Sequence, residues 1–110
     1  MPVFQVIQRN IREEASLKGT DDATVNVSGY SITKNRYQLT VTGASVGTIA
    51  LFYTTDGVDY YAVKDSDGVD FSFDLTAKEG IVFDASITGL RAVGSGVTGG
   101  WEVKVISSVI

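Results

Sequence analysis

Hydrophobic and polar residues alternate along much of this chain, and the alternation predicts β-strands. The clearest case is 37–42, "YQLTVT", in which Tyr37, Leu39 and Val41 point one way and polar residues point the other way. A strand of this kind lies in a sheet that has one buried face and one wet face. The segment 48–54, "TIALFYT", is apolar at both sets of positions, which predicts a strand that is either covered on both faces or has one face against a partner.

The same patterns predict further short strands, separated by turns rich in glycine and aspartate. These strands lie at 3–9, 24–27, 60–63, 71–75, 81–83, 85–91 and 101–107, where 81–83 and 85–91 are either two strands or one strand with a bulge. Turn signals at intervals of about 8–12 residues are typical of sandwiches and barrels. The segment 10–17, "NIREEASL", could instead form two helical turns, with Asn10 as N-cap and Glu13 three residues later. We therefore predict an all-β fold with little helix: an antiparallel β-sandwich, jelly-roll or immunoglobulin-like, of about eight short strands.

The length of 110 residues predicts one folded domain. A chain of this size buries roughly 65% of its unfolded surface, which is enough for one hydrophobic core. We assign 1–22 to an N-terminal arm and 23–110 to the β-sandwich domain. The inward positions of the strands predict these core residues: Leu39, Val41, Leu51, Phe71, Phe73, Ile87, Trp101 and Val103.

Composition narrows the chemistry, because the chain contains neither cysteine nor histidine. This removes disulfides, thiolate metal sites, the usual general base, and the Ser-His and Cys-His nucleophiles. No pair among the thirteen acidic residues stands out as a glycosidase pair. We therefore expect a protein that is not an enzyme and that holds no cofactor.

Charge and hydropathy bear on the partners. The net charge of −4 is repelled by phosphate backbones, and the nine Lys and Arg residues are scattered, so we expect no nucleic-acid partner. No apolar run approaches ~18 residues, so we expect no membrane partner. The N-terminus shows no secretory signal, which is typical of a protein synthesised in a cytoplasm.

The sequence Asp-Gly-Val-Asp occurs twice, at 56–59 and at 67–70, each time followed by an aromatic residue. One interpretation is structural, because Asp-Gly adopts the positive φ that hairpin turns need. The other is a calcium site, because carboxylate oxygens suit calcium. Its candidate ligands are Asp56, Asp59, Asp65, Asp67 and Asp70. We favour the turns and assign no metal, because "DSDGVD" carries glycine at the fourth position, whereas the helix–loop–helix pattern needs it at the sixth.

Both ends of the chain are apolar, "MPVFQVIQRNI" and "VISSVI". They pair either within the sandwich as edge strands or with another chain by strand addition, and the sequence leaves both open. The candidate partner-binding residues of the second alternative are Val3, Phe4, Val6, Ile7, Arg9 and Arg12. A third surface is aromatic: Tyr60 and Tyr61 face opposite ways in a strand, so one of them is exposed, as a carbohydrate platform would require.

Two longer segments carry a resemblance to known proteins. They are "GTIALFYTTDGVDYYAV" at 47–63 and "ASITGLRAVGSGVTGGWEVKVI" at 85–106. The pattern of a strand, a [ST]-DG-V-[DN]-[YW] hairpin tip and a late "ITGLR…GG-W-V-V" ending resembles small virion proteins of tailed bacteriophages. These include capsid decoration (cement) proteins and some neck and fibre modules. The chain departs from the pattern at Tyr60–Tyr61, where tryptophan is more usual.

The resemblance implies a jelly-roll or immunoglobulin-like sandwich without catalytic residues. It implies a homo-oligomer, often a trimer, that is synthesised in the host cytoplasm and lies on the capsid exterior of a virion. Its expected partner is the major capsid protein, and its expected function is to stabilise the phage head by binding across several major capsid protein subunits. Many weak contacts in a fixed array gain from multivalency. The alternative is a carbohydrate-binding β-sandwich module of a phage fibre or of a secreted enzyme.

Overall fold

A computed structural model describes residues 12–28, 35–44, 46–77 and 80–109, and every structural statement below concerns these residues. They contain nine strands, and none of them lies in a helix long and apolar enough to cross a membrane. The strands are β1 (Arg12–Thr20), β2 (Thr24–Ser28), β3 (Arg36–Gly43), β4 (Thr48–Thr54), β5 (Tyr60–Ala62), β6 (Ser72–Asp74), β7 (Gly80–Asp84), β8 (Gly89–Ser95) and β9 (Gly100–Ser108). The prediction of an all-β fold is confirmed.

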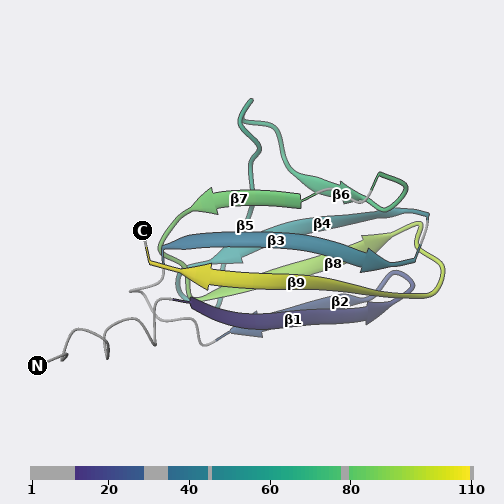
Figure 1. Cartoon of the computed structure of the whole chain (residues 1–110), viewed down its shortest axis with the longest axis horizontal. Coiled ribbons are helices and arrows are strands. Elements are labelled where there is room, and N and C mark those ends of the chain that lie inside the picture. Colours follow the sequence, from purple (N-terminus) through teal and green to yellow (C-terminus); the bar gives the residue numbers. More distant parts are fainter. Residues whose placement is uncertain (1–11, 29–34, 45, 78–79, 110) are drawn as a thin grey trace, which may run out of the picture.

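The strands form two antiparallel sheets that pack face to face as a sandwich (Figure 1). Sheet A has the order β1-β9-β3-β7, and sheet B has the order β2-β8-β4-β5, with β6 also paired to β4. Only β4 and β5 are neighbours both in the sequence and in a sheet. Strands from the first part of the chain pair with strands from the last part: β1 with β9, β2 with β8, and β3 with β7. This order of pairing defines a jelly roll. An immunoglobulin-like sandwich would instead pair its first two strands within one sheet.

The core lies between the sheets and is built from alternate residues of the strands. Tyr37, Leu39 and Val41 of β3 are buried, and the residues between them are exposed, as the alternation predicts. The predicted core is confirmed except at Phe71, which is half-buried. Phe71 directly precedes β6 and packs edge-on against the buried Phe73, with 5.0 Å between the ring centroids.

The helical alternative at 10–17 is wrong for the described residues of that segment. Residues Arg12–Thr20 form β1, which pairs with β9 along its whole length, from Arg12 opposite Ser108 to Thr20 opposite Gly100. The pairing places Leu17 in the core, where it is fully buried. Tertiary burial of this kind overrides a weak local helix signal. Residues 12–20, which we assigned to the arm, therefore lie in the sandwich.

Two strands differ in smaller ways from the expectation. The strand expected at 85–91 begins only at Gly89, because residues 85–88 connect the sheets, and the Thr88 amide donates a hydrogen bond to the Thr54 carbonyl (2.9 Å). The strand β4, expected to be covered on both faces, has outer residues Ala50 and Phe52 that are half-buried. The inner residues Ile49 and Leu51 are buried, so the inner face of β4 is better covered than its outer face.

One side of the sandwich is closed by β1, β2 and the turn between them, and we call it the closed side. The Trp101 indole donates a hydrogen bond to the Asp21 carbonyl (3.0 Å), and the carboxylates of Asp21 and Asp22 accept the amides of Gly99 and Val97 (both 2.9 Å). Asp21 adopts a positive φ of 55° at this turn. The result is a corner in which both aspartate carboxylates and the Asp21 backbone bond to β9 and to the loop that precedes it.

Candidate functional site

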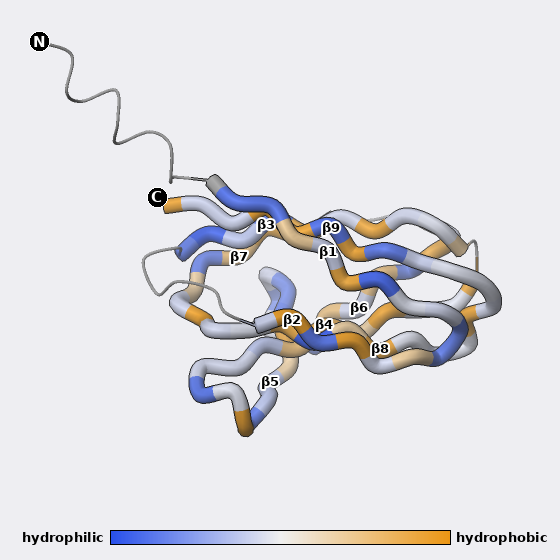
Figure 2. The backbone as a smooth tube through the Cα atoms, turned by 90° about the horizontal axis from the view of Figure 1, so that it is seen from below, coloured by the Kyte–Doolittle hydropathy of each residue, from blue (hydrophilic) through white to orange (hydrophobic). Residues whose placement is uncertain are grey.

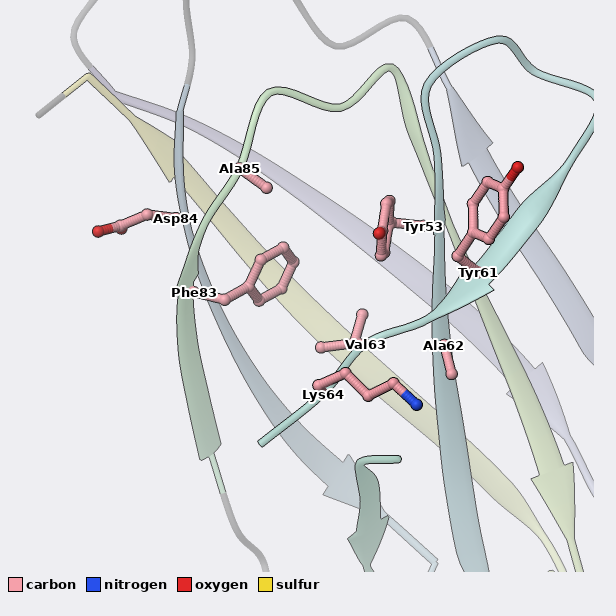
Figure 3. Close-up of a pocket in the computed structure, with 8 residues that line it drawn as sticks. All are labelled: Tyr53, Tyr61, Ala62, Val63, Lys64, Phe83, Asp84 and Ala85. Atoms are coloured by element: carbon pink, nitrogen blue, oxygen red, sulfur yellow. The ribbon is translucent and has the colours of Figure 1, made fainter. Parts of the chain in front are cut away.

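A groove runs along the opposite side of the sandwich, between β7 and the segment that contains β5 (Figure 3). We call it the open-side groove. Its first part has a volume of about 450 Å³ and is lined by Tyr53, Tyr61 and Phe83, among others. A second part of about 440 Å³ passes between β7 and the loop after β5. Lys64 lines both parts, and β7 contributes to the wall of each, so we describe them together as one groove beside β7.

Aromatic rings form the walls of the open-side groove. Figure 3 shows Phe83 pointing from β7 toward Tyr53 and Val63, while Asp84 points away. The Tyr53 and Tyr61 rings are tilted by 39° with 5.8 Å between their centroids, and Tyr61 is 53% exposed. Because Phe83 stacks on the buried Tyr37 with 5.6 Å between ring centroids, the β7 wall is anchored in the core.

Tyr37, behind that wall, is held neutral by its surroundings. Burial raises the pKa of Tyr37 to about 12, and the negative charge of Glu13 adds to the rise. The phenol lies 3.5 Å from the Ile87 carbonyl, to which it donates a hydrogen bond. The ring that supports Phe83 is therefore uncharged at neutral pH.

Two ion pairs flank the open-side groove. Lys64 pairs with Asp70 across the hairpin that follows β5. Arg36 donates two hydrogen bonds to the Asp84 carboxylate, at 2.8 and 3.0 Å, and these bonds lower the pKa of Asp84. Exposed ion pairs of this kind add little stability, but each holds a charged side chain in one place.

The first Asp-Gly-Val-Asp sequence closes the loop between β4 and β5. The Asp56 carboxylate accepts the amides of Val58 (2.8 Å) and Asp59 (2.9 Å), and these bonds lower the pKa of Asp56. Gly57 supplies the positive φ of 81°. The loop stands out beside β5 in Figure 2, with a hydrophobic position between hydrophilic ones. The structural interpretation of this sequence is confirmed.

The second copy closes the hairpin between β5 and β6 in a different way. Here the Asp65 carboxylate, two residues ahead of the repeated sequence, accepts the amides of Asp67 (2.9 Å) and Val69 (3.0 Å). Gly68 has a φ of 76°. The two copies thus make turns by different hydrogen bonds, yet each exposes its valine at the tip: Val58 is 78% and Val69 59% exposed.

Three of the five aspartates proposed as calcium ligands have separate tasks. Asp56 and Asp65 accept backbone amides within their own turns, and Asp70 pairs with Lys64. No group of three or more acidic residues in the described part of the chain is placed to hold a metal ion. The calcium interpretation, which also needs Asp59 and Asp67, stays a prediction without an assembled ligand set.

The predicted partner-binding residues fall at the edge of what the structure describes. Val3, Phe4, Val6, Ile7 and Arg9 lie outside the described residues. Arg12 begins β1, and its side chain also lies outside them. Their role in binding stays a prediction.

The prediction of one exposed tyrosine is confirmed. The Arg91 guanidinium lies 3.7 Å from the centroid of the Tyr60 ring, so Tyr60 is covered and Tyr61 is the exposed one. Sequence reasoning missed Val82, which is 57% exposed in β7 and lines the open-side groove. Its signal was present in "GIVFD", where an apolar residue occupies the outward position between two inward ones.

No known protein family and no curated protein sequence matches this chain. Solved structures do share its fold. The SPBc2 prophage-derived protein YomS is 17% identical, with a TM-score of 0.56 over 89% of this chain and 95% of that chain. A protein of the Bacillus endospore appendages, described as disulfide-linked pili, is 10% identical, with a TM-score of 0.54 over 91% and 88%.

A carbohydrate-related structure is also similar. It is the module CBM32-1 from a family 31 glycoside hydrolase of Clostridium perfringens, 15% identical, with a TM-score of 0.51 over 84% of this chain and 75% of that chain. Identities this low establish a shared fold and no more. The class that fold and groove define is a small jelly-roll protein with a groove along one open side, apolar beside Tyr53 and Phe83 and more polar beside Asp65.

Proposed function

We propose that this chain is a structural protein of a phage particle, most specifically a capsid decoration protein that binds across neighbouring major capsid protein subunits and stabilises the head. The observation that carries the proposal is the distribution of exposed apolar side chains. Among the described residues, two of the six large ones line the open-side groove, Tyr61 and Val82, and two more, Val58 and Val69, lie in the loops before and after β5.

Such clustering favours a protein contact surface. Single exposed apolar residues are ordinary, whereas a group of them beside a groove marks a site where another protein binds. The valine tips of the two loops protrude on hydrogen-bonded turns, so little conformational entropy is lost when a partner covers them. Contacts of this kind, repeated over a shell, would have to break together before the shell expands, which is the source of stabilisation.

The likeness to a prophage-derived protein over nearly the full length of both chains supports a phage origin. The likeness to a pilus subunit supports the use of this fold in assembled structures. Because both sequence identities are low, these two likenesses support the proposal only in a general way. The specific proposal rests on the contact surface described above.

Cosedimentation with phage heads tests the proposal. Heads assembled without the chain, from the phage that encodes it, are mixed with purified protein and then heated. We expect the protein to bind and to raise the temperature at which heads release DNA. The double variant Val58→Asp/Val69→Asp should lose binding by at least about tenfold, which corresponds to about 1.4 kcal/mol.

The matched control is Val46→Asp, which removes an apolar residue that is 49% exposed but lies in the connection between β3 and β4 rather than in the loops beside β5. It should bind heads as the wild type does. If the wild type fails to bind heads, or if the control loses binding as much as the double variant does, the proposal is wrong.

A second candidate is carbohydrate binding, which the exposed Tyr61 beside Tyr53 favours. Aromatic faces bordered by charged groups can stack on sugar rings, and the likeness to CBM32-1 supports this alternative. Titration with a panel of oligosaccharides, followed by NMR, tests it. Binding should be lost in Tyr61→Ala and kept in Tyr60→Ala, because Arg91 covers Tyr60. Absence of any ligand-dependent shift at Tyr61 would exclude this candidate for the panel used.

A further inference from the structure

The free edge of β7 has backbone groups that no described residue pairs with. β7 is the last strand of sheet A and pairs only with β3. The Ala85 amide donates to the Asn35 carbonyl (3.0 Å), which fixes the alternation of hydrogen-bonded residues along this pair. It follows that the backbone groups of Phe83 and Ile81 bond to β3, whereas the amide and carbonyl of Val82 point away from β3, toward the free edge of the sheet.

This edge differs from the edges on the closed side. The outward positions of β1 carry Glu14, Ser16 and Lys18, and those of β2 are polar and exposed. Charged and polar edges discourage pairing with another chain. The edge strands with exposed apolar side chains are β7, with Val82, and β5, with Tyr61, and both border the open-side groove. An added strand beside β7 would pair with its backbone and cover that groove.

The N-terminal segment has the pattern that such a strand requires. In an extended 3–9, Phe4 and Val6 share one face, and Val3 and Ile7 share the other. An added strand needs apolar residues on both faces here, because one face covers the groove and the other lies beside Val82. Most strands on a sheet surface would instead have one polar face.

Charge favours the same occupant. Residues 1–12 contain two of the nine basic residues of the chain and none of the thirteen acidic ones. The second part of the groove is bordered by the loop that carries Asp65 and Asp67, and both are exposed or half-exposed. A basic segment therefore gains from this acidic rim, an effect that salt weakens.

The distance from Arg12 to the free edge of β7 favours the N-terminal segment of a second copy over that of the same chain. The register places Arg12, Ser108, Arg36 and Asp84 in one row across sheet A. From Arg12 to a position beyond β7 is four strand spacings, or about 19 Å, which takes about six residues. Residues 6–11 of the same chain would be used in this crossing, so the segment 3–9 could pair only in part, and it would run parallel to β7, the weaker arrangement. A segment from another molecule has neither restriction.

We propose that residues 3–9 of a second copy of this chain add as an extra strand to the free edge of β7 and fill the open-side groove. Strand addition between copies rests on the proposed function and deepens it, because it names the first partner of the open side as another copy. Each copy has one such edge and one such segment, so copies can exchange them around a closed ring.

Sedimentation velocity of the full chain over a range of concentrations tests this assembly. The wild type should exceed the monomer mass of 11.7 kDa as the concentration rises. Val82→Lys, which adds a charge to the free edge, should weaken association at least about tenfold. Val6→Lys, which keeps the N-terminal segment basic, should weaken it similarly, and the double variant should be little worse than either single one.

The matched control is Gln38→Lys. Gln38 is directly opposite Val82, exposed on the same face of sheet A, but it lies on β3, which has a strand on each side. This control should associate as the wild type does. Thermal unfolding of each variant checks that the fold is kept, and Val82→Lys should keep it because the side chain is exposed.

Four results would overturn strand addition: a wild type that stays monomeric, a control as weak as Val82→Lys, single-variant effects that add fully in the double variant, or an effect of Val82→Lys without one of Val6→Lys. The last would mean that the edge takes another occupant. A monomer that still binds phage heads would overturn strand addition and leave the proposed function intact. An oligomer that behaves as expected but binds no heads would do the reverse.

Discussion

The two long sides of this sandwich are built in opposite ways. On the closed side, β1 and β2 are joined by a turn whose polar groups are paired with the loop before β9, and the Trp101 ring lies under Gly19. On the open side, β7 and β5 are separated by a groove, and large apolar side chains face solvent. The closed side therefore stabilises the fold, whereas the open side is available to a partner.

The difference is visible in how much space each side leaves. A Cβ atom at Gly19 would lie 2.3 Å from the Trp101 ring, so the closed side admits no larger residue there. Around the open-side groove, Val58 and Val82 are mostly exposed. Substitutions should therefore act on stability at the closed side and on association at the open side.

The largest expected effect is that of Trp101→Ala. It removes a buried ring and leaves the Asp21 carbonyl without its indole donor, so the free energy of unfolding should fall by about 3–5 kcal/mol. Tyr61→Ala, on the open side, should cost less than about 1 kcal/mol because the ring is half exposed. Urea unfolding followed by circular dichroism measures both, and equal losses would abolish the distinction between the sides.

A smaller loss is expected from Gly19→Ala. The added methyl group has to displace the Trp101 ring, which should cost about 1–3 kcal/mol. The control is Gly100→Ala, beside Trp101 in β9, where an added Cβ atom would meet, apart from its chain neighbours, only the Gly19 carbonyl oxygen at 4.0 Å. It should change stability by no more than about 0.5 kcal/mol. If the control cost as much as Gly19→Ala, tight packing under Trp101 would not be the cause.

Alkaline pH should weaken the wall of the open-side groove. The pKa of Tyr37 is raised from 10.0 to about 12 in the folded protein, so the fold favours the neutral phenol. That contribution to stability is complete below pH 10 and is lost as the pH rises toward 12. Urea unfolding across this range should show a decline in the wild type and a smaller one in Tyr37→Phe. The same decline in both would exclude Tyr37 as its source.

The smallest effect is expected at the first valine-tipped loop. The amides of Val58 and Asp59 lower the pKa of Asp56, so its carboxylate stabilises the loop above the unfolded pKa of about 3.9. This contribution is lost as the pH falls through the lower folded value. Asp56→Ala should speed hydrogen exchange of both amides at pH values above about 5 with little change in global unfolding. Unchanged exchange rates would contradict this role.

The sequence alone predicts the regular part of this fold well. The segment "YQLTVT" alternates because one face is buried, and the structure has Tyr37, Leu39 and Val41 in the core. The turns at Gly57 and Gly68 were also predictable, since both adopt a positive φ. Local chemistry decides these features, so local patterns report them.

What the sequence did not predict depends on contacts between distant residues. The segment 12–20 is a strand because β9 lies beside it, a fact that its own charged residues conceal. The jelly-roll order follows from pairings such as β2 with β8, which no local pattern encodes. The open-side groove was missed for the same reason, because Tyr53 and Phe83 meet only when the sheets pack.

Hydrogen exchange of the full chain across a series of concentrations tests most directly the claim that the open side is the contact side. Two backbone amides of sheet A can be compared, because each lies on an edge strand and points away from the neighbouring strand. They are the amides of Val82 on β7 and Ser16 on β1. The account predicts that protection of the Val82 amide rises with concentration while that of Ser16 does not change. Protection that rises at Ser16, or that is independent of concentration at Val82, would contradict it.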